Sequence, residues 1–484
     1  MKRIEIDPIT RLEGHGKISI FLNDEGNVEN AYLQIPELRG FEKFCEGRRA
    51  EDLPIITPRI CGVCPVAHHL ASTKALDDAF NVDPPSPAKK LRELMYCGYY
   101  IYDHILHFYF LGGPDFVVGP QAPPEQRNIL GVIEKVGLDV AKDVIKHRAY
   151  GQRITEIIGG RATHPVCGLP GGVGKALSEE DRLAVEGMAE SALGFAQFSL
   201  KLFHDVVLGN KDYVNLILSD AYTLKTYYMG LVDADNKVNF YDGQVRVVNP
   251  QGEEFLRFGP HEYLDVVAEH VEPWTYAKLP YLKRVGWRGL VDGPDSGIYR
   301  VGPLGRLNAS DGMATPLAQQ EYKRIYSTLG GKPVHSTLAF HWARLIELLY
   351  ATERALELVR DEEITSTNIR NKPKAPGEGI GIVEAARGTL IHHYQLDERA
   401  LAKKVNLIVA TVNNNPAICM SIRDAAKGLI HGGNVDEGLL NMVEMAFRAY
   451  DPCFACATHF AVGQMPLQVK IFDDEKRLVT MVKR

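Results

Sequence analysis

Two short stretches near opposite ends of the chain carry matched pairs of cysteines. RICGVCPVAHH contains Cys61 and Cys64, and DPCFACATH contains Cys453 and Cys456; in both, a histidine follows the second cysteine. The Cys-x-x-Cys spacing lets two thiolates meet one metal ion. If folding joins the two pairs, the chain has a site with four thiolate ligands, a set that selects soft or borderline metals.

Spacing alone leaves two kinds of metal site open. One is a structural zinc site, although such sites usually take both pairs from one short segment that the metal folds. A chain of 484 residues can bury a core without that help. The other is a redox or catalytic metal site. A third interpretation, four unrelated core cysteines, is disfavoured by the matched spacing of the pairs.

The remaining four cysteines stand alone in the sequence and match no iron–sulfur ligand pattern. We interpret them as thiols of the core: Cys45, Cys97, Cys167 and Cys419. We therefore expect no iron–sulfur cluster in this chain. If the chain does redox chemistry, its electrons must leave through another polypeptide.

The composition narrows the class of protein. Hydrophobic residues make up 45% of the chain and charged residues 24%, which is ordinary for a globular protein. The net charge of −6 offers no basic surplus, which disfavours nucleic-acid binding. No charge-free apolar run is long enough for a membrane span, and the start of the chain lacks a signal peptide. We expect a cytoplasmic, reduced protein, in which clustered thiols bind metals or catalyse.

Long helices must supply most of the core that positions these cysteines. Three are predicted, over residues 86–111, 178–207 and 336–363. Ser86 can cap the first, with Pro87 at its first helical position, and the second half of this helix is apolar nearly all round. Ser178 and the acids that follow it suit the start of the second helix.

Strands are predicted in three regions. Residues 17–35 form two alternating apolar runs around a turn, which indicates a hairpin. Residues 230–310 are rich in strand and turn signals, and residues 404–412 are interpreted as a buried strand. We predict a single domain over residues 1–484, mainly α with small β-sheets, an α+β fold.

The cysteine stretches resemble the two cysteine motifs of the large, catalytic subunit of nickel-iron hydrogenases. Five further stretches match family motifs in the same order: DPITRLEGHGK (7–17), RGFEKF (39–44), HFYFLGGPD (107–115), VGPLGRLN (301–308) and EAARGTLIHHY (384–394). The resemblance covers the whole chain. It implies a nickel-iron hydrogenase large-subunit-like fold with a central helical bundle.

The resemblance also implies a reaction and a ligand set. Cys61 and Cys453 would bind nickel alone, whereas Cys64 and Cys456 would bridge nickel to an iron that carries CO and cyanide ligands. Dihydrogen would be cleaved heterolytically and reversibly, with the proton going to Cys453. Glu13 matches the family's proton-transfer carboxylate.

Other residues acquire roles from the resemblance. Arg387 matches an arginine suspended near the metals, and Asp115 matches the acid that orients it. The residue before this arginine is commonly proline in the family, but here it is Ala386. His68 matches a histidine hydrogen-bonded to a bridging thiolate.

The resemblance further implies a second cation and a maturation step. Glu42 and His459 match ligands of Mg²⁺ or a similar hard cation. A dedicated protease would remove residues 460–484, just after His459, once nickel chaperones have loaded the metal. The paired His392 and His393 are interpreted as core residues that pack and hydrogen-bond, as are His104 and His107.

The implied partners include an iron–sulfur small subunit, together with further flavin or iron–sulfur electron-transfer subunits. EGHGK, RGFEKF and APPEQRNILGVI (122–133) most resemble the bidirectional NAD-linked type, with NAD(P) or ferredoxin as acceptor. Types linked to a deazaflavin or to a heterodisulfide reductase are alternatives. Alternatives of another class are a zinc-stapled scaffold and a relative of the complex I quinone-site subunit, which lacks the cysteine pairs.

Overall fold

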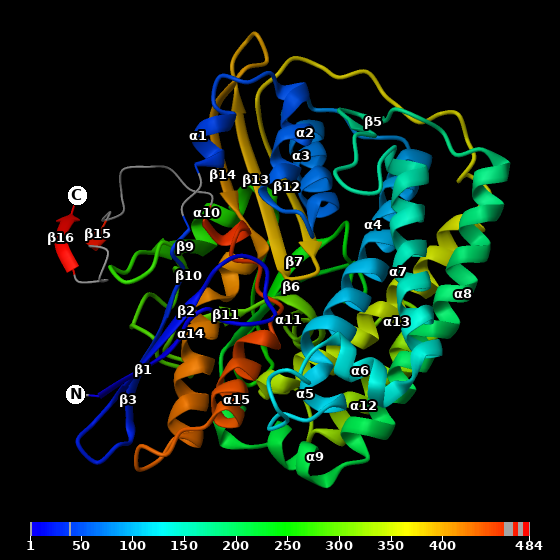
Figure 1. Cartoon of the computed structure of the whole chain (residues 1–484). Coiled ribbons are helices and arrows are strands. Elements are labelled where there is room, and N and C mark those ends of the chain that lie inside the picture. Colours follow the sequence, from blue (N-terminus) through cyan, green and yellow to red (C-terminus); the bar gives the residue numbers. More distant parts are fainter. Residues whose placement is uncertain (1, 38–39, 459–467, 473–477, 484) are drawn as a thin grey trace.

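A bundle of four long helices forms the right-hand side of the molecule in Figure 1. The computed structural model describes residues 2–37, 40–458, 468–472 and 478–483. The bundle helices are α4 (Ser86–Leu106), α7 (Leu138–Gly159), α8 (Glu179–Phe203) and α13 (Phe340–Val359). Helix α4 packs against α7 and α13, and α8 packs against α7 and α13. Nearly every residue of α13 and of the second half of α4 is buried, including the charged residues Asp103, Arg344 and Glu347.

The three predicted helices are confirmed, with one difference at a helix start. Ser178 caps α8, since its side chain accepts a hydrogen bond from the backbone N–H of Asp181. Ser86 is instead the first residue of α4, and its hydroxyl donates to Glu363 at 2.6 Å. Both helices end in a π-helical turn, a feature often found at functional sites.

An antiparallel sheet packs against helix α3 (Pro65–Ala79) beside the bundle. Its strands are β12 (Glu378–Ala385), β13 (Gly388–Leu396) and β14 (Ala402–Ile408), in that order. Glycine lets β12 approach the helix closely: a Cβ on Gly381 would lie 2.1 Å from the carbonyl oxygen of Ala71.

The strand predicted over residues 404–412 is half wrong. Strand β14 ends at Ile408, and helix α14 (Ala410–Leu429) starts two residues later. The apolar run is thus divided between the end of a strand and the start of a buried helix, which periodicity cannot distinguish over so few residues.

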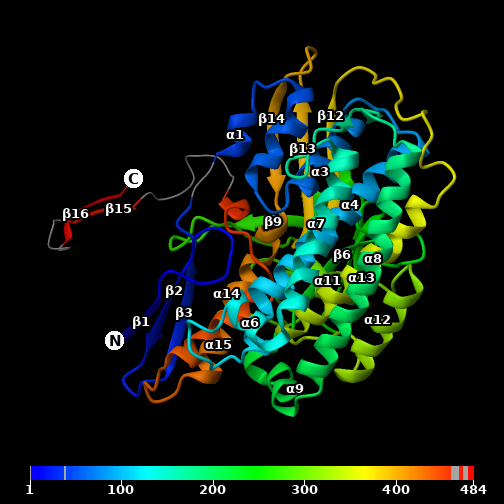
Figure 2. The same ribbon diagram turned by 45° about the vertical axis from the view of Figure 1, so that its right-hand side comes forward.

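The predicted N-terminal hairpin and central β-rich region are both present. Strands β1 (Lys2–Ile6), β2 (Lys17–Leu22) and β3 (Val28–Gln34) form one sheet, and helices α14 and α15 (Glu437–Arg448) lie between it and the bundle (Figure 1, Figure 2). The central region contains β6 (Tyr227–Val232), β7 (Gln244–Val248), β8 (Glu254–Phe258), β9 (Val267–His270), β10 (Leu279–Leu282) and β11 (Tyr299–Arg300).

Short elements complete the fold and confirm the α+β class. The helices are α1 (Phe41–Cys45), α2 (Leu53–Ile56), α5 (Pro114–Val117), α6 (Ile129–Val136), α9 (Lys211–Ile217), α10 (Tyr263–Val266), α11 (Gly302–Ala309) and α12 (Pro316–Thr328). The strands are β4 (Gly168–Leu169), β5 (Gly172–Val173), β15 (Gln468–Phe472) and β16 (Leu478–Lys483). Among the described residues, no helix is long and apolar enough to cross a bilayer.

Candidate metal centre

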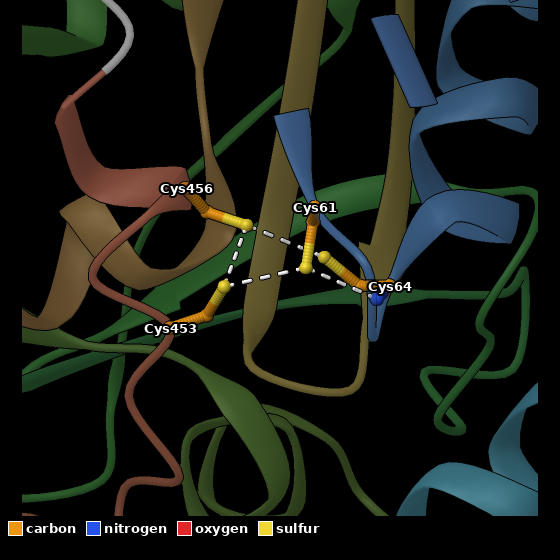
Figure 3. Close-up of side chains that lie close together, drawn as sticks. All are labelled: Cys61, Cys64, Cys453 and Cys456. Atoms are coloured by element: carbon orange, nitrogen blue, oxygen red, sulfur yellow. Dashed lines mark hydrogen bonds between the residues drawn. The ribbon is translucent and has the colours of Figure 1, made fainter. Parts of the chain in front are cut away.

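The two cysteine pairs meet in the interior of the molecule (Figure 3). Cys61 follows a turn of 3₁₀ helix, and Cys64 is the residue that precedes α3. Cys453 lies in the segment after α15 and forms a β-bridge with Glu13. The chain therefore brings together segments that are 392 residues apart.

The four sulfur atoms form a compact buried cluster. All four lie within 4.8 Å of one another. The Sγ atoms of Cys61 and Cys453 are 3.3 Å apart, those of Cys64 and Cys456 are 3.5 Å apart, and no disulfide joins them. Four free thiols this close and this deeply buried fit a soft metal centre, and they do not fit the interpretation of unrelated core cysteines.

The electrostatics of the cluster favour deprotonation of one sulfur. Burial alone would raise the pKa of the Cys61 thiol, but hydrogen bonds from the thiols of Cys453, Cys456 and Cys64 outweigh burial and lower it. The backbone N–H groups of Val63 and Cys64 also donate to Cys61 Sγ, both at 3.2 Å. The cluster thus holds negative charge in an apolar interior, where a cation would stabilise it.

Glu13 lies beside the C-terminal pair. One of its carboxylate oxygens is 2.8 Å from Cys453 Sγ and accepts a hydrogen bond of 3.2 Å from the backbone N–H of Ala455. Burial, and then the negative charge of Cys61, raise the pKa of the Glu13 carboxyl. Gly14 permits this contact, because its φ is +87° and a Cβ there would lie 2.8 Å from the Ala455 nitrogen.

Arg387 is buried and held by two acids. Its guanidinium donates to both carboxylate oxygens of Asp103, at 3.0 and 3.2 Å, and pairs with Asp451 at 2.9 Å. Burial alone would lower the pKa of this arginine, but the charges of Asp103 and Asp451 outweigh burial and keep it above the usual range. The arginine is therefore a fixed cation.

Ala386, which replaces the family's usual proline, has a hydrogen bond that proline cannot make. Its backbone N–H donates to the hydroxyl of Tyr99 at 3.3 Å. Residues 386 and 387 connect β12 to β13, and the register of this hairpin pairs Ala385 with Gly388. The hairpin and the tyrosine together restrain the arginine without a proline.

The expectation that Asp115 orients Arg387 is wrong. Asp115 binds Arg11 and accepts a hydrogen bond of 2.6 Å from Arg448. It lies beyond the π-helical turn, where the chain faces α15 and the N-terminal segment. Asp103, on α4, is the acid that faces Arg387. Its signal in the sequence is a carboxylate within the mostly apolar second half of α4, because a buried charge requires a partner.

The second-cation site is described only in part. Glu42 is buried in α1, and its Oε1 accepts a hydrogen bond of 2.8 Å from the backbone N–H of Leu407. His459, its expected co-ligand, lies outside the described residues. His68 is buried on the first turn of α3, and its expected hydrogen bond to a bridging thiolate stays a prediction.

The remaining histidines and cysteines support their interpretation as core residues. His104 is 3.1 Å from Glu347, and His107 is 2.9 Å from the carbonyl oxygen of Arg448. Burial raises the pKa of three isolated thiols to about 12: Cys45, Cys167 and Cys419.

Comparisons with known proteins agree with this site. A family model described as nickel-dependent hydrogenase matches residues 39–123 and 295–459, and a model described as HoxL-like matches residues 3–38. The chain is 46% identical over 485 residues to an F420-non-reducing hydrogenase protein of Archaeoglobus profundus that is described as an iron-sulfur subunit, covering 100% of both chains. It is 39% identical over 494 residues to the NAD-reducing hydrogenase HoxS subunit beta of Cupriavidus necator, covering 99% of both.

A solved structure shares the fold. The crystal structure of an NAD+-reducing [NiFe]-hydrogenase in the H2-reduced state matches with a TM-score of 0.90 and 38% identity, over 95% of this chain and 100% of that chain. The four buried thiols stand in the stretches that the family model covers. The chain therefore belongs to the nickel-dependent hydrogenase family, as a large subunit that cleaves H2 at a nickel–iron centre.

Proposed function

We propose that Cys453 accepts the proton when H2 is cleaved and that Glu13 carries this proton away. The observation that carries the proposal is the 2.8 Å distance between Glu13 Oε2 and Cys453 Sγ, which is hydrogen-bonding distance for proton transfer. The bound centre supplies the Lewis acidity and redox capacity that cleave H2 into two protons and two electrons. A metal-bound thiolate is deprotonated and keeps a lone pair, so Cys453 can act as the base.

Arg387 is a positioning and electrostatic residue in this proposal. Its guanidinium group stays positively charged in a protein and has five N–H donors, and Asp103 and Asp451 fix the direction of this group. A fixed cation beside the sulfur cluster stabilises negative charge without reorganising during the reaction. The same donors suit cyanide ligands on an iron.

The ligand set follows the sulfur pairs. Each short Sγ–Sγ contact between the two segments joins equivalent cysteines, Cys61 with Cys453 and Cys64 with Cys456. This supports a division in which the first pair binds nickel alone and the second pair bridges nickel to an iron that carries CO and cyanide. His68, one helical turn after Cys64, is a neighbour of the bridging pair.

Glu42 and His459 bind Mg²⁺ near the C-terminal motif. Carboxylate ligation suits such a hard cation, and Glu42 is buried and ordered by the Leu407 backbone. Residues 460–484 are a maturation extension, removed after His459 by a dedicated protease once nickel chaperones have acted. This follows from the resemblance of DPCFACATH to the family motif. Mass spectrometry of the native assembled protein tests it, since an intact tail would contradict removal.

Electrons leave through an iron–sulfur small subunit. The docking face is an apolar groove lined by Phe41, Phe44, Ile55, Ile56 and Arg59. Arg59 comes two residues before Cys61, and Gly62 is exposed, so the cluster lies close behind this surface. Among the lining residues that the structure describes, Arg59 is the charged one, and its charge is positive. The groove therefore suits a partner that presents carboxylates around an apolar centre.

The electron acceptor lies on further flavin or iron–sulfur subunits of a cytoplasmic complex. Relatives named F420-non-reducing hydrogenase subunits are 41–48% identical to this chain. Their name favours NAD(P), ferredoxin or a heterodisulfide reductase over a deazaflavin as the acceptor. Assay of the purified complex with each acceptor under H2 distinguishes these possibilities.

Elemental analysis of the native complex is the first experiment. Nickel near one per chain, iron in excess of nickel, and H2-dependent reduction of a viologen dye are expected. Zinc without nickel, in protein produced with its maturation factors and with nickel supplied, would overturn the proposal.

A further inference from the structure

A ladder of four buried polar side chains joins helix α3 to strand β13. His68 Nδ1 is 3.1 Å from His392 Nε2, and His392 Nδ1 is 2.7 Å from the hydroxyl of Tyr394. The hydroxyls of Tyr394 and Ser72 are 2.9 Å apart. All four residues are fully buried, so the hydrogen bonds form away from solvent.

The ladder is possible because the spacing of residues along one face of α3 is close to the spacing along one face of β13. His68 and Ser72 are four residues apart on α3, which places them on one face, about 6 Å apart along the helix. His392 and Tyr394 are two residues apart on β13, on one face and about 6.8 Å apart. Each helix residue can therefore meet one strand residue.

The first rung lies next to the metal ligands. Cys64 is the residue directly before α3, and the backbone N–H of His68, one turn later, donates to the Cys64 carbonyl oxygen at 3.5 Å, so the two residues lie close together at the start of the helix. The contact with His392 occupies the Nδ1 edge of the His68 ring. The opposite edge, with Nε2, then has a fixed direction.

We propose that His392, supported by Tyr394 and Ser72, is a positioning residue that sets the ring orientation of His68 beside the bridging cysteine Cys64. The proposal rests on the proposed function and extends it to the residues that lie behind His68. Hydrogen bonds behind a metal ligand or its neighbour fix orientation and tune the metal, and their loss typically costs about 10- to 100-fold.

The neighbouring residue on the strand supplies a matched control. His393 points to the other face of β13, where its Nδ1 meets the Tyr263 hydroxyl at 2.8 Å and its Nε2 meets Glu378 at 2.7 Å. It is also a buried, doubly hydrogen-bonded histidine, but these two hydrogen bonds lead away from the ladder. A general effect of losing a core histidine would appear in both variants.

The experiment compares the wild-type complex with His392→Gln, Tyr394→Phe and His393→Gln. Nickel content, the nickel electron paramagnetic resonance spectrum and the H2 oxidation rate are measured on each. We expect His392→Gln to keep its nickel, to show an altered spectrum and to lose about 10- to 100-fold in rate. Tyr394→Phe should change the spectrum in the same direction but less, and His393→Gln should match wild type.

Two results would overturn the inference. One is a wild-type spectrum in both His392→Gln and Tyr394→Phe. The other is an equal change in His393→Gln. If His392→Gln fails to assemble, Tyr394→Phe decides, because it removes one hydroxyl and keeps the ring. A wild-type complex without nickel or H2 activity would instead refute the proposed function, and the inference would fall with it.

Discussion

Glu13 and Cys453 are 440 residues apart in the sequence and 2.8 Å apart in the fold. A backbone bridge between the same two residues holds them together, and the amide of Phe454 donates to the Glu13 carbonyl at 3.0 Å. The position of the Glu13 carboxylate is therefore fixed by main-chain hydrogen bonds of Glu13 as well as by the hydrogen bonds of the carboxylate itself. Such a preset geometry is what a proton-transfer group needs.

Glu13→Gln tests this relationship. The amide keeps the size of the side chain but cannot take up a proton, so H2 oxidation and hydrogen–deuterium exchange should fall about 100-fold or more. Nickel content should be unchanged, because Glu13 is not a ligand. Glu25→Gln, in the exposed β2–β3 turn, is the control and should behave as wild type. Full exchange activity in Glu13→Gln would remove the residue from the mechanism.

Asp103→Asn tests which acid orients Arg387. Asparagine replaces one of the two acceptor oxygens with an NH2 donor and removes the negative charge, so it cannot hold both guanidinium nitrogens as Asp103 does, and the arginine should lose its fixed direction. We expect a loss of about 10- to 100-fold in H2 oxidation with the nickel still bound. The matched variant is Asp115→Asn, whose folded fraction should react at close to the wild-type rate. The reverse ranking of the two variants would restore Asp115 to the role expected from the sequence.

The sequence predicted the metal centre better than its surroundings. The cysteines can be recognised from their local Cys-x-x-Cys spacing, and Glu13 can be recognised from the short motif around it. The partner of Arg387 could not be read in this way, because Asp103 and Arg387 are 284 residues apart and meet only through packing of α4 against the β12–β13 turn. Similarly, the start of α14 within an apolar run depends on tertiary contacts and not on local pattern.

Acid titration of stability tests the role assigned to Asp115. Burial alone would raise the pKa of this carboxyl, but Arg448 and Arg11 outweigh burial and lower it. Its contribution to stability is therefore present above the unfolded pKa of about 3.9 and is lost as pH falls through the lower folded pKa. Asp115→Asn should destabilise the fold by about 3 kcal/mol near pH 7, since Arg11 loses its carboxylate partner and the buried Arg448 keeps only Glu444.

The ionic role of Asp115 predicts a pH-dependent difference in stability between wild type and Asp115→Asn. Wild type and Asp115→Asn should differ most near neutral pH. They should converge as the pH falls below about 4, where Asp115 of the unfolded chain takes up a proton first and Asp115 of the folded chain follows at its lower pKa. Denaturant unfolding of both proteins at several pH values is the measurement. A difference that stayed constant from about pH 7 to about pH 3 would contradict the ionic role of Asp115 and indicate a packing effect.

Phe44→Asp tests the docking groove. Phe44 is 53% exposed in this chain, so a charge there should change the stability of the isolated chain by less than about 0.5 kcal/mol. In the complex, the same charge would lie buried in an apolar interface, and the co-expressed iron–sulfur subunit should no longer co-purify. Leu183→Asp is the control: Leu183 is 56% exposed on α8, and helices α8 and α1 lie on opposite sides of the molecule (Figure 1). Equal loss of the partner in both variants would indicate a general defect, and retention in Phe44→Asp would place the interface elsewhere.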